Sequence, residues 1–261
     1  MRFWGEAFHV TVNVPNWAAL ERQVSGRMRA REGFSLATVN LDHLVKLRSD
    51  EKFRDAYAVH DLIIADGNPI VWMSKLASHP VCLIPGSDAI LPLSHIATKH
   101  RRRIALVGST ENTLRKSKAF LEAKVPGAHI VATIAPPMSF DPTGESADEI
   151  IDMLKTKKAD IAFLALGAPK QELFSAYART KLRSVGFVSV GAGLDFFAGS
   201  QVRAPIWVRA ICMEWLWRAS SQPVRLIPRY AKCFSILPTE IAHALRLRFS
   251  DRPISPAPES F

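Results

Sequence analysis

Several features are scarce or missing in this sequence, and each absence removes a class of protein. The three cysteines, Cys82, Cys212 and Cys233, lie far apart and form no CxxC or Cys/His cluster, which argues against structural zinc and for a reducing compartment. The first residues lack a basic region followed by an apolar segment, so no secretory signal is expected. No apolar run approaches the roughly 20 residues that span a bilayer. We therefore predict a cytoplasmic chain, which leaves open an association with a membrane surface.

Several catalytic and nucleotide-binding motifs are also missing. Gly108-Ser109-Thr110 ends an apolar run but lacks the P-loop spacing, and no G-x-G-x-x-G follows the first strand. No G-x-S-x-G elbow supplies a serine nucleophile. No Asp-x-Asp pair stands at a strand end, and no His/carboxylate cluster has metal-ligand spacing. We expect no metal and no cofactor. If a diphosphate leaves during the reaction of this protein, Lys or Arg would therefore have to stabilise its charge.

The composition is that of a folded protein with an anionic partner. Of its 261 residues, 48% are apolar and 22% are charged, and the formal net charge is +10. An excess of positive charge favours binding to nucleic acid, to nucleotide phosphates or to an acidic membrane surface.

Short apolar runs alternate with helical patterns through the first 200 residues. The predicted strands are 8–12, 35–40, 62–65, 104–107, 128–133, 161–166 and 187–190. Strands that alternate with helices indicate a mostly parallel sheet covered by helices on both faces. The fold class is therefore α/β and Rossmann-like, with residues 1–200 as the catalytic domain.

The chain changes character near residue 201. Prolines recur, arginines and tryptophans are interleaved, and few acidic residues balance the charge. We predict a basic, Trp/Arg-rich helical appendage over residues 201–250 and a disordered Pro- and Ser-rich tail over 251–261. The appendage has three interpretations: a solvated charged face, a nucleic-acid patch, or a membrane-surface element. The third is favoured because Trp and Arg together suit the headgroup boundary, and no nucleic-acid-binding motif accompanies the charge.

Asp66 is the central candidate for chemistry. It follows the buried run 62–65 and precedes Gly67-Asn68-Pro69, where a helix is expected to begin. Ligands of open α/β sheets bind at this strand end, and a carboxylate there can accept a proton from a hydroxyl. The alternative is that Asp66 only caps the following helix. His43 and His60 are expected on helix faces.

Other strand-end turns carry polar groups that could meet in one crevice with Asp66. Thr38 and Asn40 form one such turn, and Lys170-Gln171-Glu172 form another. Helix N-termini at such turns favour phosphate. Each turn taken alone is also explained by ordinary capping chemistry.

These motifs together resemble the WecG/TagA/CpsF glycosyltransferases over about residues 35–232. The residues that carry the resemblance are Thr38-Val39-Asn40, Ala65-Asp66-Gly67, Pro85-Gly86-Ser87-Asp88, Gly167-Ala168-Pro169-Lys170-Gln171-Glu172, Val190-Gly191-Ala192-Gly193-Leu194-Asp195-Phe196 and Arg203-Ala204-Pro205…Glu214-Trp215-Leu216-Trp217-Arg218. The resemblance implies an inverting, metal-independent enzyme that moves a sugar from a UDP-sugar to a polyprenyl-diphosphate-linked glycan. It further implies action at the inner face of the bacterial plasma membrane, in exopolysaccharide or other surface polysaccharide synthesis.

The resemblance also implies roles for individual residues. Asp66 matches the family's proposed general base, and Thr38, Asn40 and Gln171 match positions that line the sugar-nucleotide pocket. With the neighbouring turn residues, the candidate substrate-binding set is Thr38, Asn40, Gly67, Asn68, Ser87, Asp88, Gly167, Lys170, Gln171 and Glu172. The appendage would close over the site and touch the membrane, and its candidate diphosphate ligands are Arg203, Arg209, Arg218, Arg225 and Arg229. Oligomers are common in the family, and no nucleic-acid partner is expected.

Two positions depart from the family pattern. Cys82-Leu83-Ile84-Pro85 stands where the family usually has an arginine before the Gly-Ser-Asp turn. Pro228-Arg229-Tyr230 stands where paired arginines often precede the tyrosine. We interpret the first as the mark of a subgroup with a different donor, such as the glucosyl or glucuronosyl branches. The alternative functions are a non-catalytic nucleotide-binding module held at the membrane by the basic tail, and an RNA-binding protein.

Overall fold

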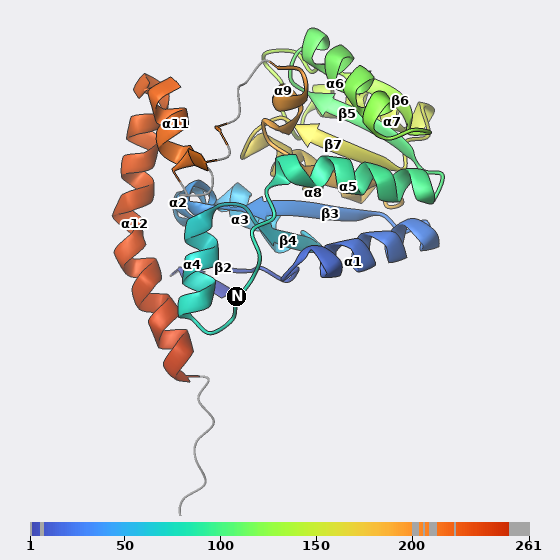
Figure 1. Cartoon of the computed structure of the whole chain (residues 1–261). Helices are drawn as coiled ribbons and strands as arrows, with labels where there is room; N and C mark the ends of the chain where they lie inside the picture. The colour runs from blue at the N-terminus through green and yellow to red at the C-terminus, as the bar shows by residue number, and fades with distance from the viewer. Residues whose placement is uncertain are drawn as a thin grey trace, which may run out of the picture.

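Strands and helices alternate along the chain, in a computed structural model that describes residues 2–5, 8–199, 204–205, 207–208, 213–221 and 223–250 (Figure 1). The strands are β1 (Arg2–Gly5), β2 (Phe8–Thr11), β3 (Phe34–Val39), β4 (Leu62–Ala65), β5 (Arg103–Gly108), β6 (His129–Ile134), β7 (Ile161–Ala165) and β8 (Gly186–Ser189). The helices are α1 (Trp17–Ala30), α2 (Leu41–Ser49), α3 (Glu51–Ala58), α4 (Asn68–Leu76), α5 (Gly86–Lys99), α6 (Glu111–Lys124), α7 (Glu145–Thr156), α8 (Lys170–Lys181), α9 (Gly193–Phe197), α11 (Glu214–Ser221) and α12 (Pro223–Ser250).

The central sheet has six strands in the order β4-β3-β8-β7-β5-β6, and every pair in it is parallel. Its strands are mostly apolar; β3 is buried along its whole length, and so is β4 at the edge of the sheet. This pattern is typical of parallel sheets with helices on both sides. The predicted α/β, Rossmann-like fold is confirmed.

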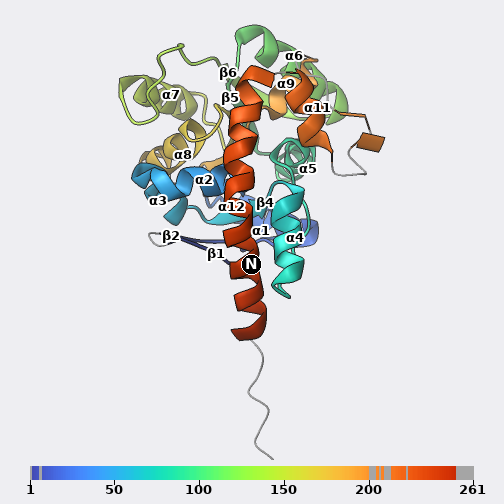
Figure 2. The same ribbon diagram turned by 90° about the vertical axis from the view of Figure 1, so that its left-hand side faces the viewer.

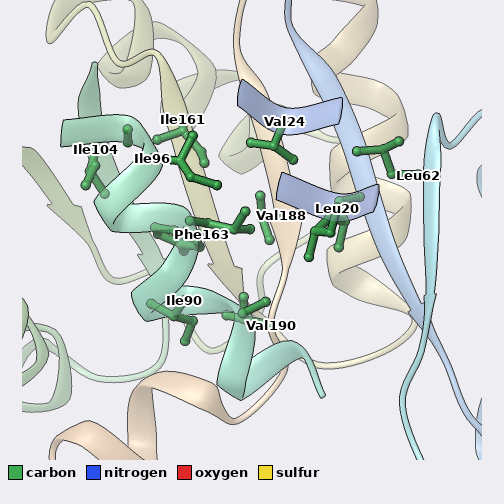
Figure 3. Packing of buried hydrophobic residues seen from close by; sticks show 14 of the residues in the cluster. Leu20, Val24, Leu62, Ile90, Ile96, Ile104, Ile161, Phe163, Val188 and Val190 are labelled. Atoms are coloured by element: carbon green, nitrogen blue, oxygen red, sulfur yellow. The ribbon is translucent and has the colours of Figure 1, made fainter. Parts of the chain in front are cut away.

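One face of the sheet is covered by α1, α5 and α6. Figure 3 shows Leu20 and Val24 of α1 and Ile90 of α5 lying over Phe163 and Val188 of the sheet. Each of these side chains is buried, and burying one aliphatic or aromatic side chain contributes about 1.5–3 kcal/mol. The opposite face packs against α2, α3, α7 and α8, through strand residues one position out of phase with the first set.

The N-terminal strand is not part of the central sheet. β2 pairs antiparallel with β1, a strand that the sequence did not predict, and together they form a separate two-stranded sheet. The chain then passes the outer edge of β4, where the Asn13 side chain accepts from the N–H of Ile63 (2.8 Å) and donates to the carbonyl of Asp61 (2.8 Å). Asn13 thus satisfies edge groups of β4 that a seventh strand would otherwise pair.

The C-terminal region contains one long helix, α12, which contacts α2 and α4 (Figure 2). Pro228 and Pro238 lie inside it, and both are on its exposed side. A proline inside a helix removes a backbone hydrogen bond, which costs least where water can satisfy the freed carbonyl. The predicted helical appendage is present. The proposed tail over 251–261 lies outside the described residues, and the boundaries at 200 and 250 stay predictions.

Candidate functional site

The carboxyl ends of β3 and β4 place Asn40 and Asp66 side by side. Val39 is in register with Ala65, and the N–H of Asp66 donates to the carbonyl of Val39 at 2.8 Å. A Cβ built on Gly67 would lie 3.7 Å from the Cβ of Asn40, so the two turns are in contact range. Two of the predicted turns therefore meet at one edge of the sheet.

Asp66 is not the capping residue of the helix that follows. Helix α4 begins at Asn68, and its N-cap position is Gly67, whose φ of 124° is a conformation that favours glycine. Asn40, by contrast, is a true cap: its Oδ1 accepts from the N–H of His43 at 3.0 Å, at the start of α2. Asp66 therefore stands one residue before the N-cap position of α4, whereas Asn40 occupies the N-cap position of α2.

The N-terminus of α5 reaches the same edge of the sheet. The N–H of Ile84 donates to the carbonyl of Ala65 at 2.8 Å, which brings the preceding segment alongside β4. A Cβ on Gly86 would lie 3.0 Å from Cγ2 of Thr38 and 3.1 Å from the carbonyl oxygen of Ser189, so only glycine fits without a shift. Ser87 and Asp88 follow in the first turn of α5, whose free N–H groups favour an anion.

The third predicted turn joins this group through Gln171. Gly167 has a φ of 72° and its carbonyl accepts from the N–H of Gln171 at 3.1 Å, at the start of α8. The Gln171 Oε1 accepts from the N–H of Gly191, just beyond β8, at 3.0 Å. Lys170 lies apart from this contact, with its Nζ 6.0 Å from the ring centroid of Phe140. The strand ends of β3, β4, β7 and β8 thus contribute to one site.

Glu172 lies beneath the site rather than on its surface. Its side chain is 0% exposed, and its Oε1 accepts from Nε2 of Gln171 at 2.8 Å. Burial raises the pKa of this carboxyl to about 8, so Glu172 is mostly protonated at neutral pH. Gln171 is itself only 2% exposed and borders the site, so Glu172 can act on a ligand only through Gln171.

This raised pKa predicts a pH dependence of stability that Glu172→Gln should remove. The unfolded chain loses the proton near the ordinary value of 4.5, whereas the folded chain keeps it to about 8. The contribution of Glu172 is therefore complete below pH 4.5 and is lost as the pH rises to about 8, by up to about 1.4 kcal/mol per pH unit. Urea unfolding of both proteins across this pH range measures the effect. If the free energy of unfolding depends on pH in the same way in both, the raised pKa of Glu172 would be contradicted.

A buried polar network that the sequence did not reveal supports Thr38. The carbonyl of Thr38 accepts from the Tyr57 hydroxyl and lies 2.7 Å from Nδ1 of His43. Burial lowers the pKa of His43 to about 4, so the ring is neutral and serves as a structural support. His60 is likewise buried, with Nδ1 2.6 Å from the carbonyl of Ala56. Both histidines were expected on helix faces; His43 lies in α2, but His60 follows the end of α3, and both side chains are buried.

Of the predicted appendage arginines, Arg229 is the one whose side chain the structure describes. Its Nε lies 2.8 Å from Oδ1 of Asp42, which also pairs with Lys46. Burial opposes ionisation of Asp42, but Lys46 and Arg229 outweigh it and lower the pKa of this carboxyl. Arg203 and Arg209 lie outside the described residues, as do the side chains of Arg218 and Arg225. Arg229 is thus anchored to the first turn of α2, two residues beyond Asn40.

Within the described ranges, no three His, Cys, Asp or Glu side chains gather closely enough to hold a metal ion. In the part of the chain that the structure covers, no helix is both long enough and apolar enough to cross a bilayer.

Comparison with known proteins gives this edge of the sheet its context. Residues 6–252 match the sequence profile described as "Glycosyl transferase WecG/TagA/CpsF family". The chain belongs to this family. The resemblance drawn from its motifs is therefore confirmed, and so is the prediction that this WecG/TagA/CpsF member is an enzyme, a glycosyltransferase.

Individual members of the WecG/TagA/CpsF family are similar at moderate identity. The N-acetylglucosaminyldiphosphoundecaprenol N-acetyl-beta-D-mannosaminyltransferase of Bacillus subtilis (strain 168) is 26% identical over 205 residues, which cover 76% of this chain and 78% of that protein. The enzyme of the same name from Staphylococcus aureus (strain NCTC 8325) is 28% identical over 162 residues, 60% of each chain.

Proposed function

We propose that this chain is an inverting glycosyltransferase that moves a sugar from a UDP-sugar to a polyprenyl-diphosphate-linked glycan in surface polysaccharide synthesis, exopolysaccharide included. The names of the two relatives support the acceptor class, because both act on a diphosphoundecaprenol-linked sugar. The observation that carries the proposal is the position of Asp66. It follows β4 beside Asn40, at the sheet edge where the N-terminus of α5 also lies.

In the proposed mechanism Asp66 is the only base. The acceptor hydroxyl attacks the anomeric carbon from the face opposite the UDP group, and Asp66 takes the hydroxyl proton. The bond from the anomeric carbon to the diphosphate oxygen breaks as the new bond forms, so one displacement inverts the configuration. A double displacement would need a second carboxylate as nucleophile.

The donor would lie across the strand ends. Thr38, Asn40 and Gln171 are the proposed contacts of the sugar nucleotide, and the N–H groups at Gly86 and Ser87 are suited to its diphosphate. The remaining proposed pocket residues are Gly67, Asn68, Asp88, Gly167 and Lys170. Arg229, with Arg203, Arg209, Arg218 and Arg225, would stabilise the departing UDP in place of a metal ion.

UDP release is the decisive measurement. A panel of UDP-sugars should be offered with lipid-diphosphate-sugar acceptors, with and without EDTA. We expect release that requires both one donor and an acceptor and that survives EDTA. Release that EDTA abolishes would contradict the metal-independent mechanism. If no UDP-sugar of the panel gives UDP release although UDP itself binds, a non-catalytic nucleotide-binding module would be favoured.

We further propose that α12 holds the enzyme on an anionic membrane. One side of α12 carries an apolar stripe of side chains that are 37–91% exposed and repeat at spacings of three, four and seven residues. The stripe consists of Val224, Ile227, Phe234, Ile241, Leu245 and Phe249. Exposed Lys232, Arg246 and Arg248 lie on the same helix, and each basic residue near anionic lipid contributes about 1 kcal/mol. This composition suits a helix lying in the headgroup region.

Charges placed in the stripe should release the enzyme from vesicles. Ile227→Asp with Ile241→Asp removes two apolar groups from the proposed interface, and we expect binding to vesicles of phosphatidylglycerol and phosphatidylcholine to fall more than 10-fold. Ser235→Asp with Thr239→Asp is the matched control, because it adds the same charge to exposed positions outside the stripe. Equal losses in both double variants would reduce the effect to net charge and contradict apolar insertion.

A further inference from the structure

The Gln171 side-chain amide is held in one orientation from both ends. The N–H of Gly191 donates to it at 3.0 Å, and a backbone N–H can only donate, so the acceptor must be the amide oxygen. The amide nitrogen then faces Glu172, whose Oε1 accepts from it at 2.8 Å. An amide nitrogen carries two N–H bonds, and Glu172 uses one of them. The orientation of Gln171 therefore depends on its sequence neighbour.

The Glu172 carboxyl lies in a buried position where an apolar side chain would cost less folding free energy. It is fully buried, where α8 packs against α3 and β3, and its Oε2 has no hydrogen-bond partner among the described residues. The charged and titratable groups that act on it are Tyr57 of α3 and Asp42 and Lys46 of α2. A buried polar group with one unsatisfied oxygen costs stability. The contact with Gln171 is the one described interaction of the carboxyl with a residue of the proposed pocket.

The position of Gln171 also affects the diphosphate end of the proposed pocket. Through Gly191 it fixes the turn after β8, and that turn packs tightly against α5. A Cβ on Gly193 would lie 3.0 Å from the Cα of Ser87, so the two backbones touch. A displaced Gln171 amide would therefore loosen both its own contact with a ligand and the turn that abuts the α5 N-terminus.

We propose that Glu172 is a positioning residue that orients the Gln171 amide toward the sugar-nucleotide donor without touching the donor itself. The proposal rests on the proposed function, since it requires a donor at Gln171. It also accounts for a carboxyl in a place where substrate cannot reach. Glu172 is thereby removed from the set of direct substrate contacts and given an indirect role.

A double-mutant cycle tests this role. Glu172→Met keeps the side-chain length but cannot accept the hydrogen bond, and we expect the Kd for UDP, measured by calorimetry, to rise about 3–10-fold, the worth of one hydrogen bond. Glu172→Gln keeps an acceptor oxygen in place and should stay within twofold of the unsubstituted protein. In a Gln171→Ala background, Glu172→Met should cost nothing further, because the group that it positions is gone. The same pattern should appear in the donor KM, with kcat changed less.

Three results would overturn the inference. Equal losses for Glu172→Met in both backgrounds would show that it acts independently of Gln171, and no loss in either would show that it does not act at all. Should Glu172→Met not fold, Glu172→Asp serves instead: it keeps the carboxyl, withdraws it from Gln171, and should give the same loss of affinity. Failure of the unsubstituted protein to bind UDP would defeat the proposed function together with this inference, whereas binding with an additive cycle would defeat the inference alone.

Discussion

Asp66→Asn should keep the fold and the affinity for UDP but lower turnover by about 10²–10⁴-fold, the usual contribution of a general base. The amide has nearly the shape of the carboxylate but cannot take the acceptor proton. The backbone N–H of Asp66 still donates to the carbonyl of Val39, and Gly67 still starts α4, so the turn has no reason to move. The loss should appear in kcat and in kcat/KM together, because the interaction is made only in the transition state.

The same chemical change at a neighbouring carboxylate provides the contrast. Asp88→Asn alters the first turn of α5, beside Ser87, whose hydroxyl lies 3.4 Å from Oδ1 of Asp88. If Asp88 contacts the donor, this change should raise KM and leave kcat nearly intact. Near-normal turnover by Asp66→Asn, measured as acceptor-dependent UDP release, would exclude Asp66 as the base.

The sequence predicts those features of the site that depend on residues close together in the chain. Buried runs that end in Asn40 or Asp66 give the strands and their exits, and the parallel register of β3 and β4 then brings those exits together. The type of turn is also local, since Gly67 takes a φ that few other residues adopt. These signals lie within a few residues of one another, which is why pattern reasoning finds them.

The sequence does not predict features that depend on contacts between residues far apart in the chain, or on how deeply a side chain is buried. Glu172 is a carboxylate beside a strand-end turn, which is typical of a site residue. Nothing in the neighbouring sequence indicates that its side chain lies in the core. No local pattern indicates that Arg229, a candidate diphosphate ligand, pairs with Asp42 of α2, far earlier in the sequence. The β1 strand was missed because four residues give too short a pattern until β2 pairs with them.

Breaking the ion pair that attaches α12 to α2 is the second change with a large expected effect. The side chain of Glu240 is 0% exposed, and its Oε1 accepts from Nη2 of Arg48 on α2 at 2.7 Å. Burial raises the pKa of Glu240, and the pairing with Arg48 only partly offsets it. Removing one partner of a buried pair typically costs 3–5 kcal/mol, and because Arg48 is 30% exposed we expect Arg48→Ala to weaken the docking of α12 by about 2–3 kcal/mol.

Hydrogen exchange along α12 measures this docking directly. Arg48→Ala should speed exchange in α12 by about 30–150-fold while the core strands keep their protection, since 1.4 kcal/mol is tenfold. Acid should shrink the defect, because protonation of Glu240 removes the unpaired charge; the sign follows from a raised pKa, which makes docking weaker as the pH rises through it. Arg48→Met with Glu240→Leu is the control, an apolar pair that should restore most of the protection.

The same variant separates donor binding from action at the membrane. Helix α12 carries both the exposed apolar stripe and Arg229, whereas Asn40, Asp66 and Gln171 belong to the sheet edge. Arg48→Ala should therefore keep the donor contacts of the sheet edge, lower UDP affinity by no more than the contribution of Arg229, and reduce turnover on an acceptor embedded in vesicles more strongly. Unchanged exchange in α12 would show that the Arg48–Glu240 pair does not hold the helix. Faster exchange with full turnover would show that a docked α12 is not needed for transfer, and would confine its proposed role to membrane attachment.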